Sequence, residues 1–277
     1  MSPPPRPASP AHPQERAGYV YAFLTMLVWA GFVLVTRIAG TGTLAAWDIT
    51  ALRLGTATLV LLPAWLFWKR VPLFNRRMFT LALIGGIGYS LLVYAAFHYA
   101  PAAHGALLVS GLLPFTMAIC VWLVLGESPT APLRRGLALI ALGVAFLAFD
   151  TFVRHGADLR GTRVWLGDLL LVASSLSWAL YSVLVRRWNI ATWDTAIGST
   201  LLAAIIYLPL YFLFLPHALA SVPVGEVALQ AVYQGLLVAV VAMVLYLQAM
   251  QRLGPARLGA LMALAPAVAG IGSSLAL

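Results

Sequence analysis

Nine apolar stretches, each about 20 residues long, fill most of the chain and limit what it can fold into. A helix needs about 20 apolar residues to cross about 30 Å of hydrocarbon. The stretches show none of the apolar–polar alternation of a transmembrane barrel. The sequence therefore predicts an all-α polytopic membrane protein, a bundle of nine transmembrane helices. The predicted spans are 18–36, 49–68, 78–99, 105–125, 136–152, 165–185, 195–215, 227–250 and 258–277.

Composition and charge agree with this class. At 62% hydrophobic and 9% charged residues, the chain does not match water-soluble domains, where about half the residues are apolar and a quarter charged. The net charge of +9 comes from basic residues between the apolar stretches, as the positive-inside rule requires, so no nucleic-acid partner is expected. The single cysteine, Cys120, excludes an intramolecular disulfide and a cysteine-based metal site.

The distribution of basic residues predicts the orientation. Twelve lie in the amino-terminal tail and the alternate loops on its side, and four lie in the other loops. This excess predicts a cytoplasmic amino terminus. Residues 1–17 contain six prolines in their first thirteen positions and are predicted to be a disordered cytoplasmic tail. The first apolar stretch has full span length, so we expect it to stay as a helix rather than be cleaved.

An internal repeat relates the two parts of the chain at a spacing of about 150 residues. It predicts a first repeat, 18–152, with five spans and a second, 165–277, with four. An odd number of spans in the first repeat makes the second inverted, an arrangement common in secondary transporters. A tenth helix is then expected to be missing. The matched pairs are Trp29 with Trp178, Arg37 with Arg186, Asp48 with Asp194, Pro63 with Pro209, Pro101 with Pro255 and Pro114 with Pro266.

These motifs, in this order, resemble the drug/metabolite transporter superfamily, EamA type. The residues that carry the resemblance are Trp29-Ala-Gly-Phe, Arg53 in Ala-Leu-Arg-Leu, Gly105-Ala-Leu-Leu through Pro114 to Gly126-Glu127, and Trp178-Ala-Leu-Tyr. The resemblance implies two inverted five-helix repeats around a central cavity, with the fifth and tenth helices peripheral, in a bacterial inner membrane. Family substrates include amino acids, amines, sugars and drugs, and a YddG-like exporter of aromatic and neutral amino acids is one member that fits.

Two helices related by the repeat each present a hydroxyl, a tryptophan and a second aromatic ring. Polar groups in a span turn toward protein or a watery cavity because hydrocarbon offers them no partner. These faces are therefore candidates for the substrate path, although hydroxyls that bond their own helix and rings that pack between helices would give the same pattern. The candidate substrate-binding residues are Thr25, Trp29 and Phe32 in one helix and Ser174, Trp178 and Tyr181 in the other.

Two more tyrosines and two prolines complete the candidates. Tyr89 and Tyr246 are predicted to bind substrate. Pro114 and Pro266 each lie within a span, where proline removes a helix hydrogen bond, so each is a candidate hinge and equally a static kink. Glycines ahead of Tyr89 are more simply explained by close helix packing.

The charged residues favour structural roles. Arg53 is expected to reach the interface or to pair with Asp48, in preference to binding an anion. Glu127 is expected to pair with Arg134 or Arg135. His104 is expected to be interfacial rather than a proton relay. No Asp or Glu lies near the middle of a span, which favours facilitated efflux or exchange.

The sequence therefore predicts a secondary transporter of a small organic metabolite, an amino acid or a related compound, working by alternating access. The alternatives are an exporter of drugs or lipophilic amines and a truncated membrane scaffold that transports nothing. An enzyme is not expected, because metalloprotease and serine-hydrolase motifs are missing, and neither is a metal, a cofactor or ATP. The expected partners are the lipid bilayer and the substrate, and a homodimer stays open.

Overall fold

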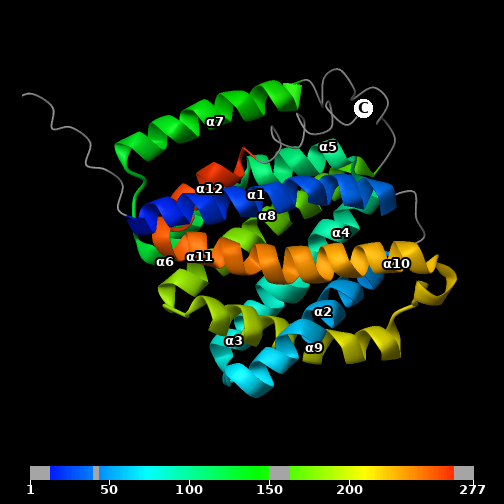
Figure 1. Ribbon diagram of the computed structural model, residues 1–277. Coiled ribbons are helices and arrows are strands. Elements are labelled where there is room, and N and C mark those ends of the chain that lie inside the picture. Colours follow the sequence, from blue (N-terminus) through cyan, green and yellow to red (C-terminus); the bar gives the residue numbers. More distant parts are fainter. Residues whose placement is uncertain (1–12, 40–43, 150–162, 265–277) are drawn as a thin grey trace, which may run out of the picture.

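The computed structural model describes residues 13–39, 44–149 and 163–264, and this part of the chain is a bundle of helices (Figure 1). The α-helices are α1 (Pro13–Ala39), α2 (Ala46–Pro63), α3 (Arg76–Leu81), α4 (Tyr89–Tyr99), α5 (Ala102–Gly105), α6 (Leu113–Leu125), α7 (Ala131–Phe149), α8 (Val164–Arg187), α9 (Thr192–Phe214), α10 (Val224–Gln230), α11 (Met243–Leu253) and α12 (Pro255–Met262). Four π-helical segments join or extend them, Ala64–Trp68, Ala82–Gly88, Ala106–Gly111 and Ala231–Ala242, and Leu219–Ser221 is a 3₁₀ turn.

Six continuous helical rods in the described part are long and apolar enough to cross a membrane. They are Ala46–Trp68, Arg76–Tyr99, Ala106–Leu125, Val164–Arg187, Thr192–Phe214 and Val224–Leu253. Each matches a predicted span with ends that differ by a few residues. The predicted first and fifth spans fall on α1 and α7, and the ninth begins in α12 and continues outside the described residues. The prediction of an all-helical polytopic bundle is therefore confirmed.

Helix α1 begins earlier than the sequence indicated. The predicted disordered tail was 1–17, but α1 is helical from Pro13. Proline is tolerated in the first turn of a helix, where its missing N–H costs nothing. Glu15 in that turn is favoured by the positive end of the helix dipole, and it also pairs with Arg257 at 2.9 Å. Residues 1–12 lie outside the described part.

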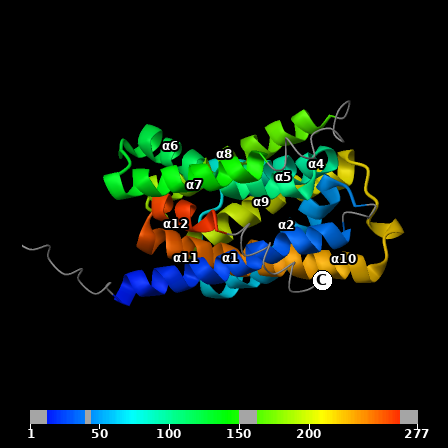
Figure 2. The same ribbon diagram turned by 90° about the horizontal axis from the view of Figure 1, so that it is seen from above.

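Packing follows the internal repeat. Helix α1 packs along α11, and its repeat counterpart α8 packs along α4. Likewise α2 packs on the π-helical segment Ala231–Ala242, and its counterpart α9 packs on Ala82–Gly88. Each pair joins one half of the chain to the other, so the two halves interlock around a shared centre. Figure 2 shows α1 alongside α11 in the second view.

Apolar side chains cover the outside and many polar ones are buried. Phe67 is 88% exposed and Phe146 is 76% exposed, and lipid is the solvent in which such surfaces are stable. Thr25, Ser174 and Gln234 are completely buried. Helix α7 lies at the edge of the bundle (Figure 1), as the resemblance implied for the fifth span. The bundle thus exposes apolar side chains and buries polar ones together with a larger apolar core.

Candidate functional site

A cluster of aromatic rings from both halves lies at the centre of the bundle. Trp29 of α1 and Trp178 of α8 meet edge to face, with ring centroids 5.5 Å apart. Tyr246 stacks on Trp29 at 5.2 Å, and Tyr89 lies tilted against Trp178 at 4.9 Å. Tyr181 stacks on the same Trp178 ring at 5.3 Å. The two tryptophans that the repeat relates are therefore in direct contact.

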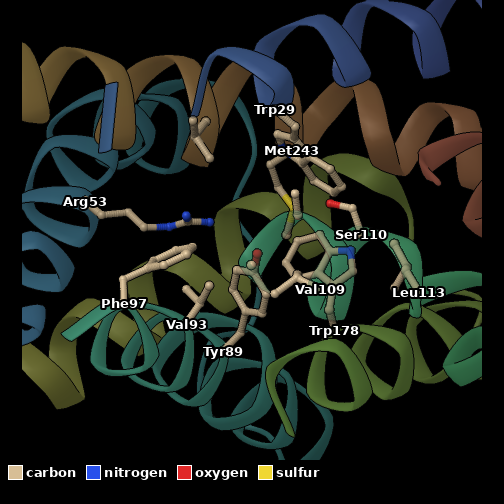
Figure 3. Close-up of a pocket in the computed structure, with 13 residues that line it drawn as sticks. Trp29, Arg53, Tyr89, Val93, Phe97, Val109, Ser110, Leu113, Trp178 and Met243 are labelled. Carbon is tan, nitrogen blue, oxygen red and sulfur yellow. The ribbon is translucent and has the colours of Figure 1, made fainter. Parts of the chain in front are cut away.

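A narrow cavity opens beside this cluster (Figure 3). Its volume is about 60 Å³, well below the 300–1,000 Å³ typical of sites that enclose a drug-sized ligand. Most of its wall is apolar, so it suits an apolar body with few polar groups. Its lining residues are Trp29, Arg53, Tyr89, Val93, Phe97, Gly105, Ala106, Val109, Ser110, Leu113, Trp178, Val238 and Met243.

Three of the predicted substrate-binding residues line this cavity, Trp29, Tyr89 and Trp178. Tyr181 and Tyr246 are completely buried behind the tryptophan rings. The hydroxyl of Tyr246 lies 2.8 Å from the Ser182 Oγ. These two tyrosines therefore support the tryptophans and do not form the cavity wall in this conformation.

The predicted hydroxyl groups bond within their own helices. Thr25 donates to the carbonyl of Tyr21 at 2.8 Å, and Ser174 donates to the carbonyl of Leu171 at 2.8 Å. Neither residue lines the cavity. In this conformation both hydroxyls bond carbonyls of their own helix, which is the alternative to substrate binding that the sequence left open.

Of the three remaining candidate residues, the structure describes Pro114 but not the Phe32 side chain or Pro266. Pro114 is buried in the first turn of α6, directly after the π-helical segment Ala106–Gly111 and a turn at Leu112. Proline in a first turn leaves no interior hydrogen bond broken, so the irregular backbone lies ahead of it. Its role as a hinge stays a prediction. The Phe32 side chain and Pro266 lie outside the described residues.

Arg53 was expected to reach the interface or to pair with Asp48, and the structure differs. Arg53 is only 7% exposed and lines the cavity. Asp48 instead accepts hydrogen bonds from the Tyr211 hydroxyl at 2.5 Å and from the Ala45 backbone N–H at 3.0 Å. Asp48 thus caps the start of α2 and ties it to α9, which leaves Arg53 facing inward. The sequence did contain a signal for this inward position, because Arg53 is a charged residue seven positions after the start of an apolar helix.

Other residues were missed for a different reason. Phe97, Ser110 and Met243 line the cavity, but nothing in their spacing separates them from lipid-facing residues. Only the packing of α4, the π-helical segment Ala106–Gly111 and α11 decides which side of each helix faces inward.

The expected pairing of Glu127 is also wrong, and His104 has a partner that was not expected. Glu127 pairs with Arg186 at 3.0 Å, while Arg134 donates to the carbonyl of Pro129. His104 is 1% exposed, and its Nδ1 lies 2.6 Å from the Asp168 carboxylate. Its expected position at the membrane interface stays a prediction. Both observed pairs join the first half of the chain to the second. Arg134 and Arg135 are closer to Glu127 in the sequence, but tertiary packing brings Arg186 of α8 closer in space.

Comparison with known proteins gives the family. The model of the EamA-like transporter family matches residues 16–149 and 165–277. "Uncharacterized transporter YyaM" of Bacillus subtilis (strain 168) is 25% identical over 193 residues, 65% of this chain and 59% of that protein. An "Uncharacterized transporter" of Archaeoglobus fulgidus is 29% identical over 168 residues, 58% of this chain and 54% of that protein. The matches thus span little more than half the length of these relatives.

A solved structure with the same fold supports the architecture. A crystal structure aligns with a TM-score of 0.67 at 24% identity, covering 94% of this chain and 88% of that one. The family match extends over both halves of the chain, including the helices that carry Trp29 and Trp178. The chain therefore belongs to the EamA-like transporter family of multi-pass membrane proteins.

Proposed function

We propose that this transporter moves a small organic metabolite, an amino acid or a related compound, by alternating access, as efflux or exchange. A bacterial inner membrane is the location that the family resemblance implies. The excess of basic residues in one set of loops supports a cytoplasmic amino terminus. The observation that carries the proposal is the contact between Trp29 and Trp178 beside one cavity. A site made from equivalent helices of two inverted halves can face either side of the membrane when the halves rock.

The cavity wall supports a substrate with an apolar or aromatic body. Trp29, Trp178 and Phe97 present rings to it, and Ser110 and Tyr89 present hydroxyls. The free space is smaller than such a substrate. Binding therefore requires the walls to move apart, which agrees with a site that opens to one side at a time.

The test is flux through liposomes that contain the purified chain. Vesicles loaded with labelled phenylalanine should show saturable efflux that unlabelled substrate outside accelerates. We expect Trp178→Ala to lower this flux by about tenfold or more, because the ring touches both the cavity and Trp29. Trp165→Ala is the matched control, since Trp165 lies on the same helix and is 67% exposed. Its flux should equal that of the wild type.

The same vesicles check the mechanism. For exchange without proton coupling, we expect the rate to be unchanged by an imposed pH gradient. Saturable flux that Trp178→Ala retains in full would show that the site lies elsewhere. No flux of any amino acid would contradict the amino-acid proposal and direct the search to amines and drugs.

A further inference from the structure

Arg53 is a buried cation with few partners. Its Nη1 donates to the Tyr94 hydroxyl at 3.4 Å, and Tyr94 donates in turn to the Gln234 Oε1 at 3.0 Å. A guanidinium has five N–H donors, and 3.4 Å is long for a hydrogen bond. Most of the donor capacity of Arg53 is therefore unused by the described residues, although the side chain is only 7% exposed.

No acidic side chain of the described part neutralises this charge. The ion pairs found there are Lys69 with Asp194, His104 with Asp168, Arg186 with Glu127 and Arg257 with Glu15. Asp48, the nearest acidic residue in the sequence, is engaged by Tyr211 and the Ala45 N–H. Burying a charge that no acidic side chain neutralises is costly, so an anionic group beside Arg53 would be stabilised.

Arg53 also lies where a ligand could reach it. It lines the central cavity and an adjoining smaller one that extends to Ser199 and Thr200 of α9. Figure 3 shows its guanidinium directed into the space among Trp29, Phe97 and Tyr89. Ser199 occupies the position in the second repeat that matches Arg53 in the first. The centre of the molecule thus has a positive charge from one half and a hydroxyl from the other.

We infer that Arg53 binds the carboxylate of the substrate while the apolar body of the substrate lies against Trp29 and Trp178. This inference rests on the proposed function and names the substrate class of the same site: monocarboxylates with an apolar or aromatic body. Guanidinium and carboxylate match as a planar, two-bond pair. A single cation beside mostly apolar walls neutralises one negative charge, which disfavours dianions such as phosphates.

The cavity is less suited to bind the ammonium group of an amine than a carboxylate. None of its lining residues is acidic, and an ammonium group beside Arg53 would be repelled. A zwitterionic amino acid gains the carboxylate contact but must place its ammonium near Ser110, Tyr89 or backbone carbonyls. The order of binding we expect is carboxylate first, zwitterion second and amine last.

Three ligands with the same ring and two-carbon chain test this order. Phenylalanine carries both charged groups, 3-phenylpropionate lacks the ammonium, and phenethylamine lacks the carboxylate. Binding to the purified wild-type chain in detergent is measured by calorimetry, with 4-methylpentanoate as an aliphatic carboxylate. We expect 3-phenylpropionate to bind tightest and phenethylamine to bind weakest. Equal or tighter binding of phenethylamine overturns the inference, and so does failure of both carboxylates to bind.

Variants then assign the contact to Arg53. Arg53→Gln should raise the Kd of 3-phenylpropionate by about tenfold or more, since it removes hydrogen bonds between two charged groups, while Arg53→Lys should restore part of the affinity. Arg76→Gln, at an exposed arginine, should leave the Kd unchanged. An unchanged Kd in Arg53→Gln overturns the inference. The wild-type comparison decides the substrate class even where Arg53→Gln does not fold.

Flux measurements separate this inference from the proposed function. Arg53-dependent binding of 3-phenylpropionate without flux would support the carboxylate site and contradict transport by this chain. Saturable flux of phenethylamine alone would support transport and overturn the carboxylate site. Flux of 3-phenylpropionate that Arg53→Gln loses supports both.

Discussion

Two tyrosines of the aromatic cluster differ in position, since one lines the cavity and the other packs behind a tryptophan ring. Tyr89 lines the cavity, whereas Tyr246 is fully buried behind Trp29. The Ser182 hydroxyl donates to the carbonyl of Trp178 at 2.8 Å, so the Tyr246 hydroxyl is the donor in its own contact with Ser182. The two phenol groups therefore make different contacts, one with the cavity and one with the protein.

Replacing each tyrosine by phenylalanine should separate these roles. Tyr89→Phe should raise the KM of transport about 2- to 10-fold, the effect of one lost hydrogen bond, with little change in thermal stability. Tyr246→Phe should lower stability by about 1 kcal/mol and leave KM unchanged. Flux in liposomes and thermal unfolding in detergent measure the two effects. A larger change of KM in Tyr246→Phe than in Tyr89→Phe would reverse the assignment.

The sequence relates some side chains of the site to each other and leaves the direction of others open, for physical reasons. Trp29 and Trp178 could be paired because the repeat aligns them, and symmetry brings equivalent residues to one axis. Thr25 and Ser174 share their helix faces, but a hydroxyl in a span can bond its own helix carbonyl, and sequence does not separate the two outcomes. Arg53 lies in a helix that is apolar on most sides, so its inward direction depended on how α2 packs.

At the scale of helices, the halves are joined by close approaches at glycine. A Cβ at Gly85 would lie 2.2 Å from the Tyr181 Cδ2, and one at Gly235 would lie 2.3 Å from the Thr56 Cβ. Gly85 belongs to the π-helical segment Ala82–Gly88 and Gly235 to its counterpart Ala231–Ala242. The predicted role of the glycines before Tyr89 in close packing agrees with this geometry.

Adding a methyl group at Gly85 should disturb this contact. Gly85→Ala forces the Tyr181 ring to shift, and overpacking of this kind costs about 1–3 kcal/mol, so the unfolding temperature in detergent should fall. Gly143→Ala is the control, because a Cβ at Gly143 meets nothing within 4 Å, and alanine is the better helix former. Equal unfolding temperatures for the two variants would contradict the packing argument.

Hydrophobicity predicted the membrane-spanning helices but not the π-helical segments within them. Span length follows from the bilayer, so the six rods matched the apolar stretches within a few residues. The π-helical segments have no signal in the hydrophobicity pattern, and the close approach of Gly85 to Tyr181 falls within one of them. The pair of Glu127 with Arg186 joins residues 59 positions apart, and only the assembled bundle brings them together.

At the scale of the whole molecule, the two ends of the bundle are joined by different contacts. Among residues 13–39, 44–149 and 163–264, three ion pairs, each partly exposed, join the halves at the end predicted to be cytoplasmic. They are Lys69 with Asp194, Glu127 with Arg186 and Glu15 with Arg257. Exposed pairs contribute about 0–1 kcal/mol each, so these contacts can separate at low cost.

The opposite end is joined by buried groups. Asp48 bonds Tyr211 at 2.5 Å and His104 lies 2.6 Å from Asp168, with Asp48 fully buried and His104 nearly so. Separating buried polar partners exposes unsatisfied groups and costs more than separating exposed pairs. We therefore expect the cytoplasmic end to open more readily than the other end.

Cross-linking the cytoplasmic end tests whether this opening is part of transport. Lys69→Cys and Asp194→Cys, combined in a Cys120→Ala background, would be joined by a short membrane-impermeant bifunctional thiol reagent. If the halves must part there, the cross-link should abolish flux, while either single cysteine treated in the same way keeps it. The reagent should act on inside-out vesicles and not on right-side-out ones, which also tests the orientation. Full flux in the cross-linked protein would contradict alternating access through this end, because a site between two rocking halves cannot empty past a covalent bridge.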